Sequence, residues 1–172
     1  MPPAPETAGR ACRLADKVAW LERSLGPGDE LIETHFAYVL LAGDRAWKLR
    51  KPVRRDPMDY STLEARRRDS EAEVRLNRRL ARHAYLGTRP LTLESDGRLA
   101  LGGSGVVVDW LVEMRRLDRK RMLDVALAAG EATDDDLHAV AALLASFYAR
   151  EASAVTDGTT LQARLLAQVA AN

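Results

Sequence analysis

The spacing of apolar residues changes along this chain, and the order of the changes restricts the fold. Strand-like patterns dominate residues 30–114, but one long helical pattern, residues 61–82, interrupts them. After Leu117 every apolar pattern repeats at three- and four-residue spacing, which is typical of helices. This separation of a strand-rich part from a helical part predicts an α+β fold and not a doubly wound parallel sheet.

Turn residues divide the strand-rich part into shorter segments. Gly43-Asp44 predicts a first hairpin, and Ser95-Asp96-Gly97 predicts a second. The glycine-rich run at residues 102–105 is interpreted as a hairpin loop, because it leads into a strand and offers no helix N-terminus to a phosphate. The predicted strands are residues 30–34, 36–41, 45–53, 90–94, 98–101 and 106–114.

Apolar spacing and capping residues predict the helices. Ser61 and Glu64 fit a capping box at the start of the long helix. The apolar residues Val74, Leu76 and Leu80 of this helix are expected to face the sheet. The predicted helices are residues 14–25, 61–82, 122–129, 133–150 and 161–170.

The composition is that of a globular chain of about one domain, with 172 residues, 47% apolar and 30% charged. Cys12 is the only cysteine, which excludes intrachain disulfides and thiolate zinc cages, and a cytoplasmic location is expected. No apolar run reaches about eighteen residues, so no membrane segment is expected. Residues 45–82 hold thirteen Lys/Arg and six Asp/Glu, and this local excess of positive charge could attract phosphates.

One lysine in the predicted sheet calls for a charged partner. Ala46 and Lys48 are two residues apart in a strand, so they lie on one face, and Trp47 lies on the other. Glu73 follows in the long helix, next to the apolar residue Val74 that is expected to pack on the sheet. A strand lysine held by a helix glutamate is the arrangement that places an ammonium on nucleotide phosphates in kinases.

Several segments resemble one family, the N-terminal domain of bacterial bifunctional aminoglycoside phosphotransferase/ATP-binding proteins. The most specific segments are residues 44–53 (Asp-Arg-Ala-Trp-Lys-Leu-Arg-Lys-Pro-Val) and 73–80 (Glu-Val-Arg-Leu-Asn-Arg-Arg-Leu). Shorter matches are residues 33–35, 85–87, 107–110 and 114–117. The resemblance covers roughly residues 31–150.

The resemblance implies a protein-kinase-like fold that binds ATP with Mg²⁺. It divides the chain into a tail and helix (1–28), a kinase-like N-lobe (29–114), and a hinge with a partial helical C-lobe (115–172). Five residues are implied to bind the nucleotide: Lys48 at the phosphates, Glu73 as its ion-pair partner, Ala46 beneath the adenine, and Met114 and Arg115 at the hinge. The acceptor is expected to be a hydroxyl group of an unidentified small molecule.

The chain departs from this family in its catalytic parts. No Gly-x-Gly-x-x-Gly loop precedes the first hairpin, and no His-Gly-Asp catalytic loop or metal-binding aspartate follows the hinge. No catalytic residue or metal ligand is therefore assigned, and the chain is expected to be a fragment or a shortened gene product. The missing C-terminal part, or a P-loop kinase domain, is its expected partner.

Two other functions are compatible with the sequence. One is a noncatalytic module that binds nucleic acid or an acidic partner through residues 45–82. Nucleic acid is not the expected partner, because Trp47 and Tyr60 alone give no stacking platform for bases. The other is a pseudokinase fragment that serves as an interaction surface.

Overall fold

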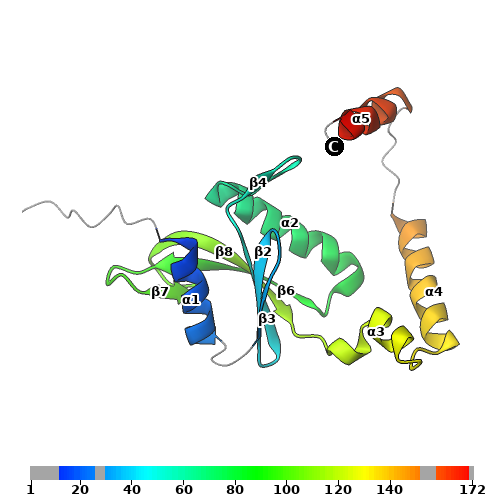
Figure 1. Cartoon of the computed structure of the whole chain (residues 1–172), viewed down its shortest axis with the longest axis horizontal. Helices are drawn as coiled ribbons and strands as arrows, with labels where there is room; N and C mark the ends of the chain where they lie inside the picture. Colours follow the sequence, from blue (N-terminus) through cyan, green and yellow to red (C-terminus); the bar gives the residue numbers. More distant parts are fainter. Residues whose placement is uncertain (1–11, 26–29, 152–157, 171–172) are drawn as a thin grey trace, which may run out of the picture. The chain divides into compact units, whose positions relative to one another are not determined.

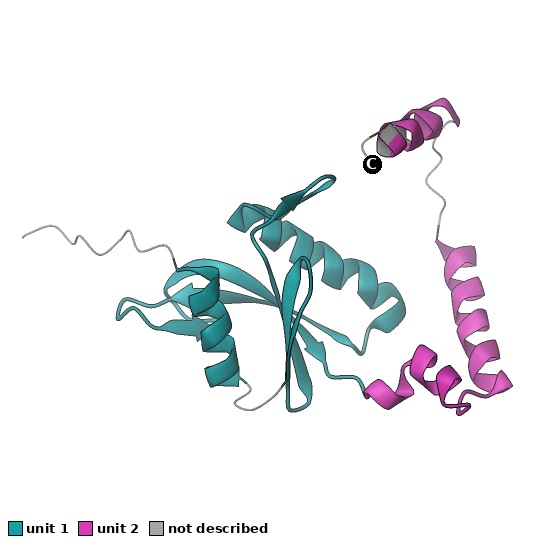
Figure 2. Ribbon diagram, in the orientation of Figure 1, with its two compact units in different colours: residues 1–117 teal, residues 118–172 magenta. Residues whose placement is uncertain are grey.

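The computed structural model describes residues 12–25, 30–151 and 158–170. The chain divides into two compact units, and the boundary follows Leu117 (Figure 2). Of the predicted tail-and-helix segment 1–28, residues 1–11 and 26–28 lie outside the described residues. Within the described residues, the first unit contains two sheets and two helices, and the second unit is helical, which confirms the predicted α+β class.

Six strands of the first unit form one antiparallel sheet in the order β1-β2-β3-β8-β6-β7 (Figure 1). They are β1 (Glu30–Glu33), β2 (Ala37–Ala42), β3 (Arg45–Arg50), β6 (Tyr85–Leu93), β7 (Leu99–Leu101) and β8 (Val106–Arg115). Both hairpins predicted from turn residues are present, as β2–β3 and β6–β7. The last strand, β8, lies inside the sheet between β3 and β6.

The connection between β7 and β8 differs from the prediction. Residues 102–105 do not form a hairpin loop, because β7 and β8 both pair with β6 and not with each other. The loop therefore passes close to the backbone of β6. A Cβ atom on Gly105 would lie 2.2 Å from the carbonyl oxygen of Leu93, so the close approach requires glycine at this position.

Other boundaries also differ from the prediction. β6 begins at Tyr85, five residues before the predicted start at Pro90, and β3 ends at Arg50, before Pro52. A small second sheet, β4 (Arg54–Arg55) and β5 (Met58–Asp59), was not predicted. Its strands have two residues each, which is too short for an alternating apolar pattern.

Helix α1 (Leu14–Leu25) covers one face of the sheet and builds the main apolar core. Its residue Leu21 is fully buried, and Leu14, Val18 and Leu25 pack around the same cluster, as their helical spacing predicts. The strands contribute Trp47 and Leu49 of β3 among others. The buried cluster consists of Leu21, Leu40, Ala42, Trp47, Leu49, Leu91 and Leu111.

Helix α2 (Leu63–Ala81) covers the opposite face, on which Lys48 lies. Its N-cap is Thr62, whose hydroxyl accepts a hydrogen bond from Ala65 N at 3.1 Å, so the predicted Ser61 cap is wrong by one residue. The Ser61 hydroxyl instead donates to Asp59.

The buried face of α2 is more polar than its sequence pattern predicts. Val74 is buried, but Leu76 and Leu80 are 50% and 40% exposed, so the predicted apolar stripe is wrong at these two positions. Arg66 and Ser70 occupy the inner face instead. The chain can bury Arg66 because its guanidinium finds partners on every side.

Asp109 of β8 connects the helices on the two faces of the sheet. Its carboxylate accepts hydrogen bonds from Lys17 of α1 at 2.7 Å and from Arg66 of α2 at 2.8 Å. All three side chains are at most 8% exposed. The β6–β8 register shifts between Leu91 and Thr92, which pair with Asp109 and Val107. The three charged groups thus satisfy one another within the first unit.

The described part of the second unit contains a short 3₁₀ helix and three α-helices: η1 (Arg119–Arg121), α3 (Leu123–Ala128), α4 (Asp134–Arg150) and α5 (Gly158–Ala170). Thr133 caps α4, and Asp136 completes a capping box. Leu137 and Val140 of α4 are about 40% exposed. Among the described residues, no helix combines the length and the apolar character needed to cross a membrane.

Candidate functional site

Lys48 lies on the face of the sheet that α2 covers. Alternation along β3 places Ala46, Lys48 and Arg50 on this face and Trp47 with Leu49 in the core on the other. Lys48 pairs with Val39 of β2 and Val112 of β8, so strands flank it on both sides. The lysine is therefore fixed in the middle of the sheet.

Glu73 of α2 binds the ammonium of Lys48 with both carboxylate oxygens. The distances from Lys48 Nζ to Glu73 Oε1 and Oε2 are 2.9 and 3.0 Å. The Glu73 side chain is 10% exposed, whereas that of Lys48 is 24% exposed. The structure thus brings together the two residues that the sequence paired, and the Lys48 side chain stays partly exposed.

Arg50 is a second cation at the same carboxylate and was not predicted from the sequence. Its guanidinium donates to Glu73 Oε2 and pairs with Asp69, one helical turn earlier on α2. The same guanidinium lies 4.8 Å from the centre of the Tyr60 ring, within the range of a cation–π contact. Arg50 follows Lys48 by two residues, so strand alternation was a usable signal.

Ala46 and Met114 are direct cross-strand partners on β3 and β8. Ala46 is buried, at 6% exposure, and Met114 is partly buried. Arg115 ends β8 with an exposed side chain, and its backbone N–H donates to the Ala84 carbonyl at 2.7 Å. The first two residues therefore adjoin each other near one end of the sheet, two residues from Lys48 along β3. Their role in nucleotide binding stays a prediction.

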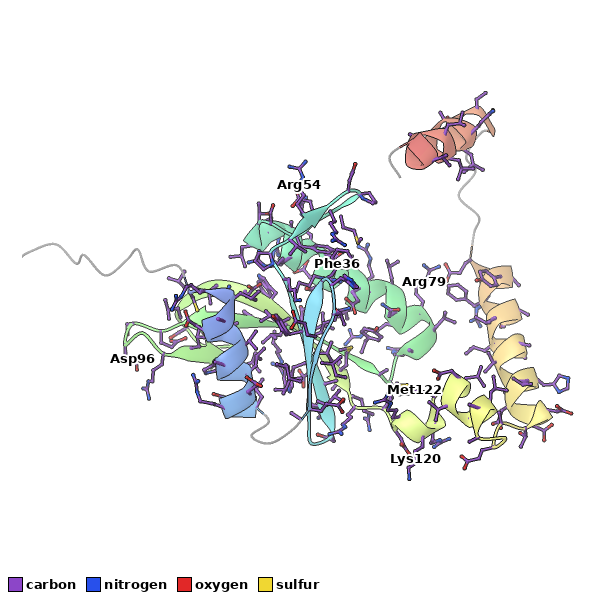
Figure 3. All side chains as sticks on the ribbon, viewed as in Figure 1. Phe36, Arg54, Arg79, Asp96, Lys120 and Met122 are labelled. Carbon is purple, nitrogen blue, oxygen red and sulfur yellow. The ribbon has the colours of Figure 1, made fainter. Side chains whose placement is uncertain are left out.

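The turn between β1 and β2 packs against the surroundings of Arg50. Phe36 of this turn (Figure 3) meets Tyr60 edge-on, with ring centres 6.1 Å apart. Thr34 closes the turn through hydrogen bonds with Ala37. Burial raises the pKa of Tyr60, and the nearby Asp69 carboxylate raises it further, whereas Arg50 lowers it. The turn between β1 and β2 is thereby linked through Tyr60 to Arg50.

Many cations of the basic region are paired with neighbours. On α2, Arg67 binds both Glu64 and Glu71, and its hydrogen bond lowers the pKa of Glu64. Arg54 lies 3.5 Å from Asp59, and Arg78 donates to the Tyr85 and Leu86 carbonyls. The positive charge of residues 45–82 is thus largely distributed among local contacts.

The described residues contain no group of three or more His, Cys, Asp or Glu side chains suited to hold a metal ion. Glu73 is paired with Lys48 and Arg50, and Asp69 is paired with Arg50. Mg²⁺ therefore finds no ligand set in the described part of this chain.

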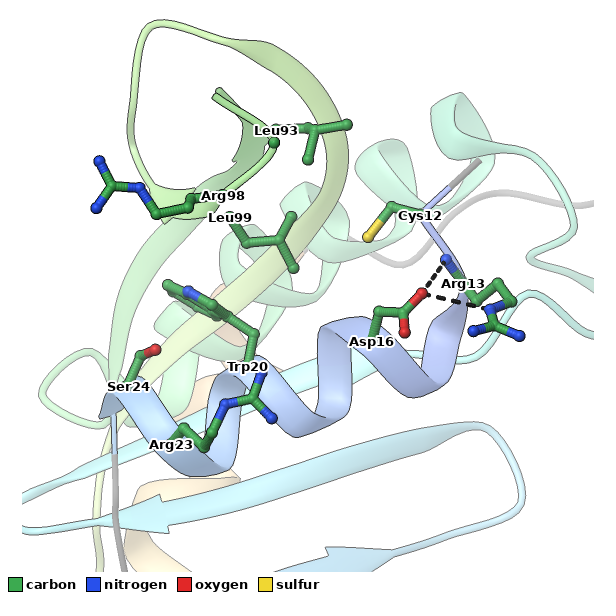
Figure 4. A pocket seen from close by; sticks show the side chains of 10 residues that line it. Cys12, Arg13, Asp16, Trp20, Arg23, Ser24, Leu93, Arg98 and Leu99 are labelled. Atoms are coloured by element: carbon green, nitrogen blue, oxygen red, sulfur yellow. Dashed lines mark hydrogen bonds and ion pairs between the residues drawn. The ribbon is translucent and has the colours of Figure 1, made fainter. Parts of the chain in front are cut away.

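A pocket of about 730 Å³ lies elsewhere in the first unit, between α1 and the β6–β7 hairpin (Figure 4). Its wall includes Trp20, Leu93 and Leu99, and arginines lie at its rim. Arg13 is paired with Asp16 there. None of the five predicted nucleotide-binding residues lines this pocket, so it is separate from the Lys48–Glu73 pair.

Comparisons with known proteins identify relatives but no activity. Uncharacterized proteins of Mycobacterium bovis and of two Mycobacterium tuberculosis strains are each 40% identical to this chain over 124 residues. Each match covers 72% of this chain and 23% of the relative, so the chain spans just under a quarter of the length of these relatives. No protein-family model matches the chain, and no solved structure matches it significantly.

Proposed function

We propose that this chain is the ATP-binding part of a small-molecule kinase similar to the aminoglycoside phosphotransferases, without the catalytic loop. Lys48 binds the phosphates of ATP, and Glu73 orients the lysine. The complete enzyme transfers the terminal phosphoryl group to a hydroxyl of a small molecule. This chain contributes positioning and positive charge, which are the main elements of phosphoryl-transfer catalysis.

The ion pair between Lys48 and Glu73 is the observation that supports this proposal best. In protein kinases, a lysine of the third strand pairs with a glutamate of the nearby helix, and this pair must be in place for activity. Lys48 lies on the third strand of the chain and Glu73 on the helix that follows the small β4–β5 sheet. Because Lys48 is partly exposed, an anion can reach its ammonium.

The neighbouring residues are compatible with an adenine site. Ala46 has a small side chain on the same face as Lys48, and Met114 adjoins it on β8. We propose that the adenine packs near these two residues and that Arg115 marks the start of the hinge. Mg²⁺ neutralises phosphate charge in kinases. Its ligands are expected outside the described residues, so no step is assigned to the metal here.

Local ion pairing favours nucleotide binding over the alternative of nucleic-acid binding. A nucleic-acid surface uses many cations at once to neutralise successive phosphates. Arg54 and Arg67 already contact carboxylates of their own neighbourhood. Lys48 is paired with Glu73 as well, but binding of one polyphosphate needs this single ammonium and not a row of free cations.

Equilibrium dialysis of ATP against the purified chain tests the proposal. The unchanged chain is expected to bind ATP, and Lys48→Met is expected to weaken binding by about tenfold or more, because a charge-assisted hydrogen bond is lost. Arg98→Met is the matched control, since it removes an exposed cation from the β6–β7 turn. In a longer protein that includes the catalytic loop, Lys48→Met is expected to abolish turnover.

Two results would contradict the proposal. The first is an unchanged chain that does not bind ATP at millimolar concentration. The second is equal ATP affinity in the Lys48→Met and Arg98→Met variants, which would show that Lys48 contributes only general charge. Salt-sensitive binding of short oligonucleotides without binding of ATP would favour the nucleic-acid alternative.

A further inference from the structure

The pocket of about 730 Å³ between α1 and the β6–β7 hairpin has the volume of a small-molecule site. Trp20 and Leu99, which line this pocket, also pack against the buried cluster under α1. The pocket therefore lies on the face of the sheet that α1 covers, whereas Lys48 and Glu73 lie on the face that α2 covers. A ligand of this pocket occupies a site that is separate from the proposed ATP site.

Apolar side chains give the pocket one flat wall. Trp20 extends from α1 toward the β6–β7 hairpin (Figure 4), and Leu93 and Leu99 line the pocket from the hairpin. Because Trp20 and Leu99 pack on the core, the fold holds both side chains in place. An indole offers a flat surface on which another aromatic ring can stack. This wall is therefore suited to a planar apolar group.

Three arginines and one aspartate line the pocket, so its lining has a net positive charge. Asp16 lies 3.4 Å from Arg13, and Asp96 of the hairpin turn lies 2.6 Å from Arg98. Arg23 is in the last turn of α1 and makes no hydrogen bond or ion pair with any residue that the structure describes. One cation of the pocket is thus left for a ligand with one negative charge.

We propose that this pocket binds a small planar aromatic carboxylate. The aromatic ring stacks on the indole of Trp20, and the guanidinium of Arg23 binds the carboxylate. A planar guanidinium can hold a carboxylate through two parallel hydrogen bonds. Arg23 follows Trp20 by three residues, so the two side chains lie on the same side of α1 and contact one ligand together.

Two other classes of ligand fit the pocket less well. A polyphosphate carries several negative charges, but Arg13 and Arg98 already bind carboxylates of their own neighbourhood. An organic cation meets a lining of net positive charge, in which Asp16 is already paired. The charge of the lining therefore selects a single carboxylate.

Naphthoate is a suitable probe, because it combines a planar ring system with one carboxylate. In an NMR titration, the indole N–H signal of Trp20 is expected to shift, whereas those of Trp47 and Trp110, which do not line the pocket, stay in place. Trp20→Phe assigns the signal by its loss. Naphthylmethanol has the same rings without the charge and is expected to bind about fivefold more weakly. No shift at millimolar naphthoate, or equal affinity for both compounds, would overturn the proposal.

Arg23→Met tests the guanidinium. It is expected to weaken naphthoate binding about fivefold and to leave naphthylmethanol binding unchanged, because only the carboxylate uses this cation. Arg75→Met is the matched control, since it removes an exposed cation from α2 on the opposite face of the sheet. Lys48→Met is likewise expected to leave naphthoate affinity unchanged. An equal loss in Arg23→Met and Arg75→Met would show a response to net charge alone and would contradict the proposal.

Ser24→Trp tests the place of the site without altering the core. Ser24 is an exposed residue of α1 that lines the pocket, so a large side chain there is expected to block naphthoate and naphthylmethanol alike. Ala15→Trp adds the same side chain at an exposed position of α1 outside the pocket and is expected to bind both compounds normally. Unchanged naphthoate affinity in Ser24→Trp would place the binding elsewhere and refute the proposal.

Discussion

Lys17 and Asp109 are ninety-two positions apart in the sequence and form a buried ion pair at 2.7 Å. Arg66 binds the same carboxylate from α2, and the backbone carbonyl of Val108 accepts a second hydrogen bond from Lys17. A buried carboxylate with two cations fixes the positions of both helices on the sheet. Since α2 carries Glu73, this contact also contributes to the geometry of the Lys48 site.

Replacing Asp109 is expected to destabilise the first unit strongly. Asp109→Asn leaves two buried cations without their counter-charge, and a loss of about 3–5 kcal/mol in the free energy of unfolding is expected. Urea unfolding followed by tryptophan fluorescence measures this loss, because all three tryptophans lie in the first unit. Asp16→Asn, which breaks an exposed pair with Arg13, is the control and is expected to cost less than about 1 kcal/mol. Equal effects of the two variants would contradict the prediction.

Leu49 is expected to be a major contributor to the core. Its side chain is fully buried in the cluster beneath α1, so Leu49→Ala is expected to lower the free energy of unfolding by about 2–5 kcal/mol. Leu76→Ala removes the same atoms from a half-exposed position on α2 and is expected to change stability by less than about 1 kcal/mol. The same urea titration compares the two variants. A larger loss for Leu76→Ala would show that α2 packs differently.

The hydroxyl of Thr62 is expected to stabilise the start of α2. Thr62→Ala removes the acceptor of the Ala65 amide and is expected to cost about 1 kcal/mol in unfolding free energy. Thr62→Ser keeps the hydroxyl and is expected to retain most of the stability. Helix content by circular dichroism and urea unfolding measure both effects. If Ser61→Ala lowers the free energy of unfolding more than Thr62→Ala does, the N-cap of α2 is Ser61, as the sequence predicted.

The reactivity of Cys12 is expected to rise on unfolding at neutral pH. Burial raises the pKa of its thiol, and only the thiolate reacts with a disulfide reagent. Folding raises this pKa, so the protonated thiol contributes stability to the folded chain at pH values below the pKa of the unfolded chain. This contribution is lost as the pH rises through the pKa of the folded chain. Labelling of the native chain is therefore expected to reach half its maximal rate at a higher pH than labelling in urea. An identical pH profile in both states would contradict the prediction.

Local patterns in the sequence were sufficient to predict most of the helices and hairpins of the fold. Helical spacing predicted α1 with its buried Leu21, and turn residues predicted the β2–β3 and β6–β7 hairpins. The prediction was wrong at the 102–105 loop, because a glycine-rich turn does not reveal which strands pair. The pairing of β6 with both β7 and β8 is a long-range property of the sheet.

The candidate site was predictable only in part. Lys48 and Glu73 were found because strand alternation and the position of Val74 place them on facing surfaces. Arg50 was not predicted, although the same alternation places it on the face of Lys48. The ion pairs of Asp109 had no local signal, since Lys17 and Arg66 come from distant segments.

The interior position of β8 determines when the sheet can be completed during synthesis. Until residues 106–115 have left the ribosome, β3 lacks its neighbour, and the β2–β3 hairpin has an open edge. An unpaired edge strand in a nascent chain is a template for association with other chains. Translation must therefore proceed through almost all of the first unit before this edge is closed.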